Sequence, residues 1–210
     1  ALAGVSLSVA PGEIVLLQGP NGAGKTTILE LCGGLRRLES GTGAVLGHDL
    51  GTSRRLVRSR VGLLGHSTGL YDALTVEENV RFWAAAVHAD LKTVPSALMR
   101  LGLETRLHGV EVRRLSAGQR RRTALATLLV RRPELWLLDE PHAALDHDGR
   151  DIVDDLVAQV AQSGGTVFLV SHEIERVMNI STRVVTVAGG VVVADSGCPS
   201  AFSGETSDVP

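Results

Sequence analysis

Cysteine is scarce in this sequence, and neither sign of charge is in large excess. The two cysteines, Cys32 and Cys198, have no metal-site spacing and make no disulfide framework, which fits a reducing, cytosolic compartment. Lysine occurs only as Lys25 and Lys92, which we attribute to genomic codon bias because the other basic residues are arginines. A formal net charge of −2 provides no global basic field. We therefore expect no nucleic-acid partner.

Long apolar runs are also missing. No segment approaches the roughly 18 consecutive apolar residues that a membrane span requires, so we expect the chain not to cross a bilayer. The best candidate, residues 184–194, is interrupted by Gly189-Gly190. This interruption predicts a hairpin whose strands cover residues 183–187 and 191–194.

The first residues lack the basic leader and the uninterrupted apolar core of a signal peptide. Instead, Leu2, Val5, Leu7 and Val9 predict a half-buried strand that begins almost at residue 1. We expect a few further residues to precede Ala1 in the natural chain.

The remaining composition is that of a folded α/β protein. With 210 residues, 44% hydrophobic and 21% charged, the chain can form one large domain or a domain with a subdomain. Short apolar runs predict buried strands at residues 14–17, 61–64, 135–138 and 166–170. The last three of these runs are followed by polar residues, at the position where open α/β sheets bind ligands.

Helical patterns separate the predicted strands. Apolar residues recur at helical spacing after residue 25 (Ile28, Leu31, Cys32, Leu35) and again after residue 150 (Ile152, Val153, Leu156, Val157, Val160). Residues 54–60 are expected to be a polar, arginine-rich link. Residues 75–130 are expected to be helical, with capping boxes at Thr75/Glu78 and Ser116/Gln119 and with Pro95 in a first turn. The polar tail, residues 196–210, carries no informative signal.

A glycine-rich segment carries the first functional signal. It comprises Gly19, Pro20, Asn21, Gly22, Ala23, Gly24, Lys25, Thr26 and Thr27, which match G-x-x-x-x-G-K-[ST] between a predicted strand and a predicted helix. The backbone N–H groups of such a loop surround phosphates at a helix N-terminus, whose dipole favours negative charge. We expect Lys25 to reach the β- and γ-phosphates of ATP and Thr26 to place its hydroxyl on Mg²⁺. The flanking strand and helix disfavour the alternative of a chance glycine-rich turn.

Two carboxylates follow the strand predicted at residues 135–138. We expect Asp139 to hold Mg²⁺ through a water molecule, because Mg²⁺ keeps several waters and takes few carboxylates. We expect Glu140 to act as the general base on an attacking water. A simple turn at the strand end would also explain these residues, but the phosphate loop favours the catalytic interpretation.

The segment Leu115, Ser116, Ala117, Gly118 and Gln119 could be only a capping box. It is followed, however, by LWLLDEP (residues 135–141), Ala144-Leu145-Asp146 and His172. In this order the chain resembles, over essentially its whole length, the nucleotide-binding subunit of an ATP-binding-cassette (ABC) transporter. The resemblance implies an α/β phosphate-loop NTPase core with a helical subdomain and a small β subdomain. Residues 1–210 would form one domain, with the core at 1–65 and 133–210 and the helical subdomain at 66–132.

The same segment also implies a partner. Ser116 and the N–H groups around Gly118 form a second helix N-terminus that could hold a γ-phosphate but lies too far from Lys25 in its own chain. In the family that the chain resembles, two ATP molecules lie between two head-to-tail subunits. The resemblance further implies that Asp146 communicates across that interface and that His172 contacts the γ-phosphate and orients Glu140 and the water. Integral membrane subunits would hold the pair at the cytoplasmic face of the cell membrane.

His66 departs from the family pattern, which usually has a glutamine at this hinge to sense Mg²⁺ and the γ-phosphate. A neutral imidazole can still accept from a metal-bound water, although it is shorter and offers a single acceptor. His66 is thus a candidate sensor and metal ligand. A loop residue without nucleotide contact is the alternative. A second departure is that residues 1–18 contain no aromatic side chain on which adenine could stack.

Short motifs narrow the resemblance. Gly65-His66-x-x-Gly69-Leu70, Leu74-Thr75-x-x-Glu78-Asn79 and Asp146-His147-Asp148-Gly149 are similar to the haem-exporter-type ABC ATPases of cytochrome c maturation. By family position, residues 67–75 would face the cytoplasmic helix of the membrane subunit.

We therefore expect the ATP-hydrolysing subunit of a membrane exporter of that type. An exporter of drugs, lipids or polysaccharides is the near alternative. A soluble ABC ATPase is disfavoured because the chain has one cassette and no coiled-coil insert. A nucleotide-regulated binding module without hydrolysis is disfavoured by intact Lys25, Asp139, Glu140 and His172.

Overall fold

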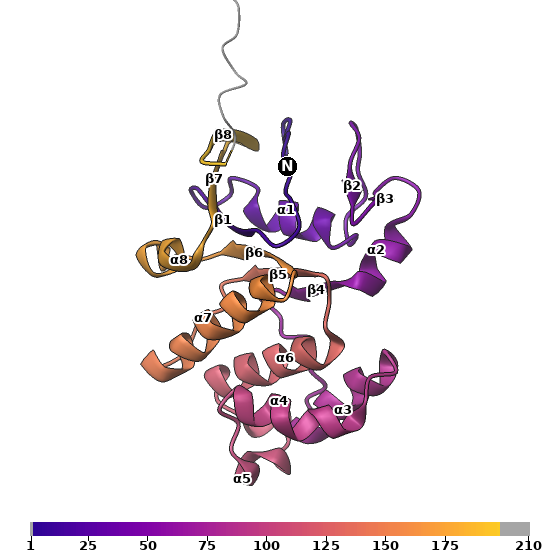
Figure 1. Cartoon of the computed structure of the whole chain (residues 1–210), viewed down its shortest axis with the longest axis vertical. Coiled ribbons are helices and arrows are strands. Elements are labelled where there is room, and N and C mark those ends of the chain that lie inside the picture. The colour runs from indigo at the N-terminus through magenta and orange to yellow at the C-terminus, as the bar shows by residue number, and fades with distance from the viewer. Residues whose placement is uncertain (1, 198–210) are drawn as a thin grey trace, which may run out of the picture.

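The computed structural model describes residues 2–197 (Figure 1). Its central element is a six-stranded sheet. Its strands lie in the order β4 (Val61–Leu64), β5 (Leu135–Asp139), β6 (Thr166–Val170), β1 (Ile14–Gln18), β7 (Arg183–Ala188) and β8 (Val191–Asp195). All neighbours are parallel except β7 and β8, which pair as the predicted hairpin. A separate two-stranded sheet joins β2 (Ala44–Val45) to β3 (His48–Asp49). The predicted α/β fold with a parallel core is confirmed.

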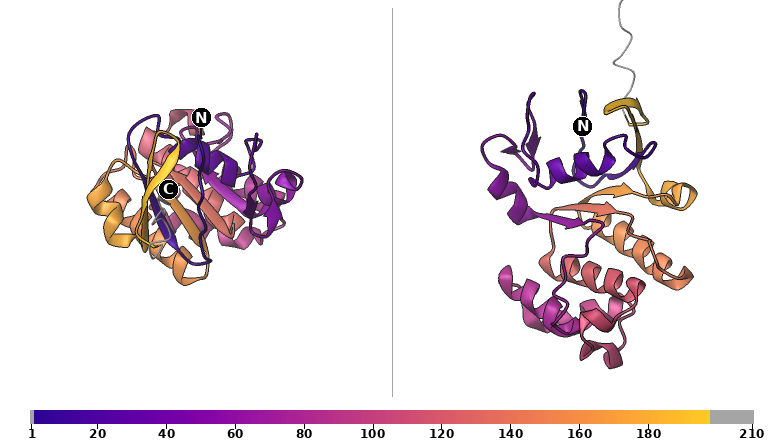
Figure 2. Two further views of the ribbon diagram at one scale, coloured as in Figure 1. Left: turned by 90° about the horizontal axis from the view of Figure 1, so that it is seen from above. Right: turned by 180° about the vertical axis from the view of Figure 1, so that it is seen from behind.

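Helices cover both faces of the sheet, as the view from behind in Figure 2 shows. One face carries α1 (Lys25–Cys32) and α2 (Arg54–Arg60). Along the chain, the other helical elements are α3 (Val76–Ala86), η1 (Leu91–Thr93), α4 (Val94–Arg100), α5 (Thr105–His108), η2 (Val112–Arg114), α6 (Ala117–Arg131), α7 (His147–Gln162) and α8 (Ile174–Ile180). The segment predicted to be helical, residues 75–130, is thus a series of helices separated by short turns.

Alternate residues of each central strand enter two separate hydrophobic clusters. In β1, Leu16 belongs to the cluster formed with α3, α4, α6 and α7, whereas Leu17 belongs to the cluster formed with α1 and α2. Because both faces are buried, the strands are continuous apolar runs in the sequence. The first cluster extends without interruption from the sheet to Val80 of α3 and Leu98 of α4.

Both predicted capping boxes are present. The hydroxyl of Thr75 accepts from the backbone N–H of Glu78, whose side chain accepts from the Thr75 N–H, and Ser116 and Gln119 do the same at α6. Pro95 lies in the first turn of α4, as predicted. These local signals were sufficient because each motif satisfies the backbone N–H groups of its own helix start.

The strand predicted near residue 1 is wrong. Among the described residues, residues 2–13 form only an isolated bridge from Gly4 to Val191. The four apolar side chains are half-buried against the α1 side of the sheet, as their alternation indicates (Leu2, Val5, Leu7, Val9). Alternation reports which side is buried, but a strand also needs a partner for its backbone hydrogen bonds.

Two helix predictions are also corrected. Residues 54–60 form α2 instead of a link, because Val57 is fully buried beneath the sheet while the arginines, which are good helix formers, remain on the outside. Helix α1 ends at Cys32, so Leu35 does not extend it and is 53% exposed. The two glycines that follow explain this end, since Gly34 adopts a φ of 66°.

Cys32 is the one cysteine among the described residues, and it is a free thiol. Cys32 is partly buried at the end of α1, and burial raises the pKa of its thiol to about 11. Cys198 lies outside the described residues, as does most of the predicted tail.

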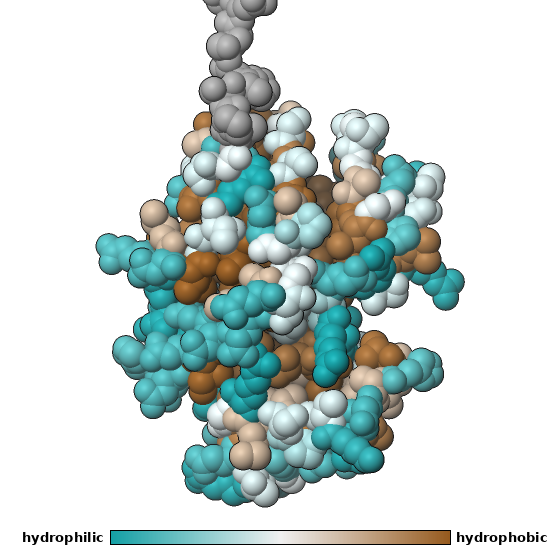
Figure 3. All heavy atoms as spheres, in the orientation of Figure 1, coloured by the Kyte–Doolittle hydropathy of each residue, from teal (hydrophilic) through white to brown (hydrophobic). Residues whose placement is uncertain are grey.

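No helix among residues 2–197 is both long enough and apolar enough to cross a membrane. Hydrophilic side chains cover much of the face seen in Figure 3, and apolar side chains form smaller groups between them.

Candidate active site

The phosphate loop connects the end of β1 to the start of α1. Gly19 allows the loop to pass against β7, because a Cβ atom there would lie 1.9 Å from the carbonyl oxygen of Val187. Gly24 is the N-cap of α1, with a φ of 107° and no side-chain hydrogen bond to the first turn. The first N–H groups of α1 therefore point out of the loop without a side-chain acceptor, which is the arrangement that binds anions.

Lys25 lies folded over this loop. Its Nζ donates to the carbonyl oxygens of Gly19, at 2.7 Å, and Pro20, at 3.0 Å. The ammonium group is thus held on the loop itself, where phosphate oxygens could replace the two carbonyls as acceptors.

Thr26 and Asp139 are brought together although 113 residues separate them. The hydroxyl of Thr26 donates to Oδ2 of Asp139 at 3.0 Å. The contact arises because α1 packs beside β5, whose carboxyl end carries Asp139. Both predicted Mg²⁺ residues therefore present oxygen atoms at one point.

Glu140 and His172 meet at the neighbouring strand ends of β5 and β6. The backbone N–H of His172 donates to Oε2 of Glu140 at 3.1 Å, and His172 Nε2 lies 3.6 Å from Oε1. Glu140 has a φ of 52°, an uncommon value for a residue with a side chain. Its own N–H donates to the carbonyl oxygen of Val170 at 2.8 Å. The backbone N–H of Glu140 is therefore held by the last residue of β6, and its carboxylate by the N–H of His172, two residues beyond that strand.

The LSAGQ segment contacts a different part of the molecule. Among the described residues, no hydrogen bond or ion pair joins residues 115–119 to residues 19–27. Gly118 packs against the loop after Glu140, because a Cβ atom there would lie 2.6 Å from the carbonyl oxygen of Ala144. Asp146 ends that loop and caps α7 by accepting from Gly149 N–H at 3.0 Å. The chain alone thus does not bring the LSAGQ segment to its own phosphate loop.

The order of these motifs along the fold matches a known family. Residues 2–143 match the family model described as ABC transporter. The chain belongs to the ABC transporter family. The predicted ABC-type fold is confirmed, and the chain is an ATPase of this family.

Relatives and solved structures agree with this membership. The chain is 39% identical over 171 residues to the cytochrome c biogenesis ATP-binding export protein CcmA of Vibrio parahaemolyticus, with 80% of this chain and 83% of that protein covered. It is 40% identical over 174 residues to CcmA of Paramagnetospirillum magneticum, with 81% and 80% covered. The ATP-binding cassette MJ0796, solved as a dimer in a post-hydrolysis state with ADP and Pi, superposes with a TM-score of 0.85 at 26% identity, covering 92% of this chain and 89% of that one.

His66, where many ABC ATPases have glutamine, follows β4 on an exposed loop. Its side chain makes no hydrogen bond to another described residue, and the structure does not join it to Asp139 or Glu140. Its role as a sensor therefore stays a prediction.

Arg121 contacts the backbone of the site although it belongs to none of the sequence motifs described above. It lies on α6, is 6% exposed, and its guanidinium donates to the backbone carbonyls of Gly65, Asp139 and Glu140. Burial lowers the pKa of Arg121, and the nearby carboxylates of Asp139 and Glu140 oppose this shift. The sequence contained a signal, because Arg121 shares helical spacing with residues 124, 125 and 128 on the buried face of α6.

Asn79, which belongs to the motif at residues 74–79, has a structural role that the sequence did not indicate. It is fully buried in α3, and its amide accepts from the N–H of Tyr71 at 2.8 Å and donates to the Tyr71 carbonyl at 3.0 Å. The loop that the family places beside the membrane subunit is thereby fixed from within. Tyr71 itself is 47% exposed and packs edge to face on Phe82, which is 45% exposed.

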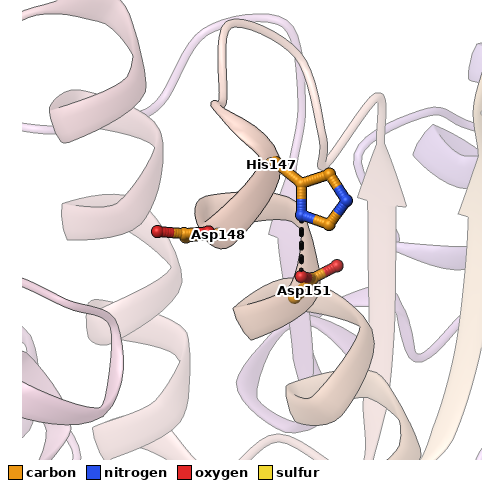
Figure 4. Close-up of side chains that lie close together, drawn as sticks. All are labelled: His147, Asp148 and Asp151. Atoms are coloured by element: carbon orange, nitrogen blue, oxygen red, sulfur yellow. Dashed lines mark ion pairs between the residues drawn. The ribbon is translucent and has the colours of Figure 1, made fainter.

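An exposed cluster at the start of α7 is better explained as an ion pair than as a metal site (Figure 4). His147 Nδ1 lies 2.9 Å from Asp151 Oδ2. Asp151 is also hydrogen-bonded to Arg176, which holds the pKa of its carboxyl below its ordinary value. The negative charge that a cation would need is therefore already partly neutralised.

Proposed function

We propose that the chain is the ATP-hydrolysing subunit of a membrane exporter of the cytochrome c biogenesis type. The observation that carries this proposal is the identity of about two residues in five with CcmA proteins over four fifths of the chain, 39% in one case. Under this proposal the chain acts as a head-to-tail dimer at the cytoplasmic face of the membrane.

ATP would bind first to the phosphate loop. The N–H groups at the start of α1 and the Nζ of Lys25 are positioned to receive its phosphates, with residues Gly19, Pro20, Asn21, Gly22, Ala23, Gly24, Thr26 and Thr27 forming the cradle. Lys25 would exchange two carbonyl oxygens for phosphate oxygens, so its charge gains an anionic partner on binding.

The donor set beside the loop fits Mg²⁺. The Thr26 hydroxyl and the Asp139 carboxylate are hard oxygen ligands and lie 3.0 Å apart. Thr26 would ligate the ion directly and Asp139 through water, and His66 is the candidate for a further contact. The ion, when bound, neutralises charge on the β- and γ-phosphates.

Hydrolysis would depend on Glu140. Its carboxylate accepts from the backbone N–H of His172, and the imidazole Nε2 of the same residue lies 3.6 Å from its other oxygen. We infer that Glu140 accepts a proton from the attacking water and that His172 keeps Glu140, the water and the γ-phosphate in line.

A second protomer would complete the site. Leu115, Ser116, Ala117, Gly118 and Gln119 present a helix start that their own phosphate loop does not contact, so we infer that they act on the partner's ATP. Asp146 would pass the state of one site to the other, because its loop touches Gly118 through Ala144. The dimeric state of the MJ0796 cassette supports this arrangement.

The membrane subunits would dock on α3 and the loop before it. The chain has only six aromatic side chains, and Tyr71 and Phe82 place two of them in contact on this surface. Exposed aromatic side chains are enriched at protein interfaces. We infer that residues 66–132 act as the helical subdomain that moves with this partner and that residues 1–65 and 133–210 form the nucleotide-binding core.

Haem staining of c-type cytochromes tests the export assignment. The source organism lacking this gene is expected to lose the stained bands. The wild-type gene should restore them, and Lys25→Ala should not, because it removes the phosphate-binding ammonium while leaving the fold around it.

A Tyr71→Ala/Phe82→Ala variant tests the docking surface. It should bind ATP normally and fail to co-purify with the membrane subunits.

The outcomes separate the two levels of the proposal. Unchanged bands in the deletion strain would reject cytochrome c biogenesis and favour an exporter of drugs, lipids or polysaccharides. If the Lys25→Ala gene restored the bands fully, ATP-driven export would be rejected as the role of this site.

A further inference from the structure

We propose that Arg121 is a positioning residue that sets the backbone of Glu140 according to the position of α6. One guanidinium group joins three chain segments, all through backbone carbonyls. Its Nη1 donates to Gly65 at the end of β4, at 2.9 Å, and its Nη2 donates to both Asp139 and Glu140 at the end of β5. The inference rests on the proposed role of Glu140 as the base.

The backbone at Glu140 needs such a partner. A φ of 52° for a residue with a Cβ atom is strained, and strained conformations persist only where the surroundings fix them. The N–H of Glu140 is held by Val170 and its carbonyl by Arg121, so the peptide groups on both sides of the Cα atom have partners from outside their strand. Without Arg121, the Glu140 carbonyl would keep only the local turn bond from the N–H of Ala143, at 3.1 Å, which would let the backbone relax and turn the carboxylate away from its working direction.

The direction of coupling follows from the position of Arg121. It lies in the second turn of α6, the helix that starts with the LSAGQ segment. A displacement of α6 would change the hydrogen bonds to Glu140. The guanidinium is planar and its N–H groups point in fixed directions, so once it moves it cannot keep good hydrogen bonds to all three carbonyls. Contact of Ser116 with a partner's nucleotide is thereby linked to the base for the chain's own nucleotide.

Gly65 extends the link to the loop of the proposed sensor. Gly65 is the first residue after β4, and His66 follows it directly. The Arg121 side chain is buried, and its Nε has no hydrogen-bond partner among residues 2–197. The group is therefore held by its terminal nitrogens alone, which all point toward the active-site edge of the sheet.

Arg131 provides a matched control at the far end of the same helix. Its Nη2 donates to the carbonyl of Val61, at the start of β4, at 3.3 Å, and its Nε also has no partner among the described residues. Arg121→Met and Arg131→Met thus each remove a guanidinium–carbonyl link between α6 and β4. Only the first link reaches Glu140.

The experiment measures ATP turnover, ATP affinity and melting temperature of the full chain assembled with its membrane subunits. Arg121→Met is expected to lower kcat by about 10²-fold, since small misplacements of catalytic groups have effects of that order, while the dissociation constant for ATP stays unchanged. Arg131→Met should keep kcat while lowering the melting temperature. Arg121→Lys, which keeps the charge but loses the fork, should have an intermediate kcat.

Three results would overturn the inference. One is a folded Arg121→Met assembly with wild-type kcat. Another is a fall in kcat that Arg131→Met matches, which would indicate a general effect of stability. The third is full turnover in Arg121→Lys. A Glu140→Gln variant measured in parallel keeps the two proposals apart, because its retention of activity would reject Glu140 as the base whatever Arg121 does.

Discussion

The N-termini of α1 and α6 would bind the same ATP from opposite sides in the proposed dimer, yet they are built differently. Helix α1 starts at a glycine, Gly24, and no side chain accepts from its first turn. Helix α6 starts at Ser116, whose hydroxyl accepts from Gln119, and the Gln119 side chain accepts from Ser116 in return. The backbone N–H groups at the start of α1 are therefore open to an anion, whereas at the start of α6 side chains of the same helix start already accept from the N–H groups of Ser116 and Gln119.

This difference indicates an order of events. We expect the phosphate loop to bind ATP in a single chain once Lys25 leaves the carbonyls of Gly19 and Pro20. The start of α6 must give up part of its capping box before it can bind a phosphate, so its contact is expected to form later and to be weaker. ATP would therefore bind to the loop first and bring the second helix start to it afterwards.

The largest expected effect comes from a variant that should trap ATP between the start of α1 in one protomer and the start of α6 in the other. Glu140→Gln is expected to lower turnover by about 10³-fold, because it removes the general base while keeping the shape of the side chain. ATP should then accumulate between two protomers, which gel filtration would detect as a dimer. A purely monomeric Glu140→Gln protein in the presence of ATP would contradict the head-to-tail arrangement.

Removing the charge at α1 is expected to have the next largest effect. Lys25→Ala should reduce kcat/KM for ATP by about 10²-fold, because an ammonium group aimed at the phosphates is lost. The matched control is Lys92→Ala, since Lys92 is the only other lysine and lies exposed on η1. Equal ATPase activities of the two variants would contradict the predicted role of the phosphate loop in ATP hydrolysis.

At α6 the expected effect is smaller and falls on a different step. Ser116→Ala should lower turnover about tenfold, the loss of one hydrogen bond to a charged group, while ATP binding to the single chain is unchanged. It should also lower the free energy of unfolding by about 1 kcal/mol, the usual value of an N-cap. Thr75→Ala removes the same kind of cap from α3 and should match the stability loss without affecting turnover. Denaturant unfolding and steady-state ATPase assays measure the two quantities separately.

The smallest effect concerns the two capping boxes. Glu78 closes the box of α3, and hydrogen bonds from Thr75 hold the pKa of Glu78 below its ordinary value of 4.5. Because this pKa is lowered by folding, the contribution is present above pH 4.5 and is lost as the pH falls through the folded-state value. Glu78→Gln, which copies the box of α6, should lose less stability than the wild type between neutral pH and a pH below 4.5. Identical losses would show that the Glu78 box does not contribute.

Much of the site could be predicted because its parts are local. The phosphate loop and both capping boxes are complete within a few residues, and parallel strands place their carboxyl ends at one edge. This is why the pairing of Thr26 with Asp139, 113 residues apart, agrees with the sequence pattern.

The missed features depend on contacts that no short window contains. Arg121 donates to carbonyls 56, 18 and 19 residues away, so its role is visible only in the folded chain. Helix α2 has a single fully buried residue, Val57, and gives almost no periodic signal. The segment around Val5 shows the alternation of a strand, but pairing requires a neighbour with free backbone groups.

The close contact between Gly118 and Ala144 has a further consequence. In the proposed dimer, the segment that each chain would contribute to its neighbour's nucleotide packs directly against the loop that follows its own Glu140. In the proposed head-to-tail dimer, we therefore expect occupancy of one site to change the geometry of the other, so that ATP turnover at the two sites is coupled.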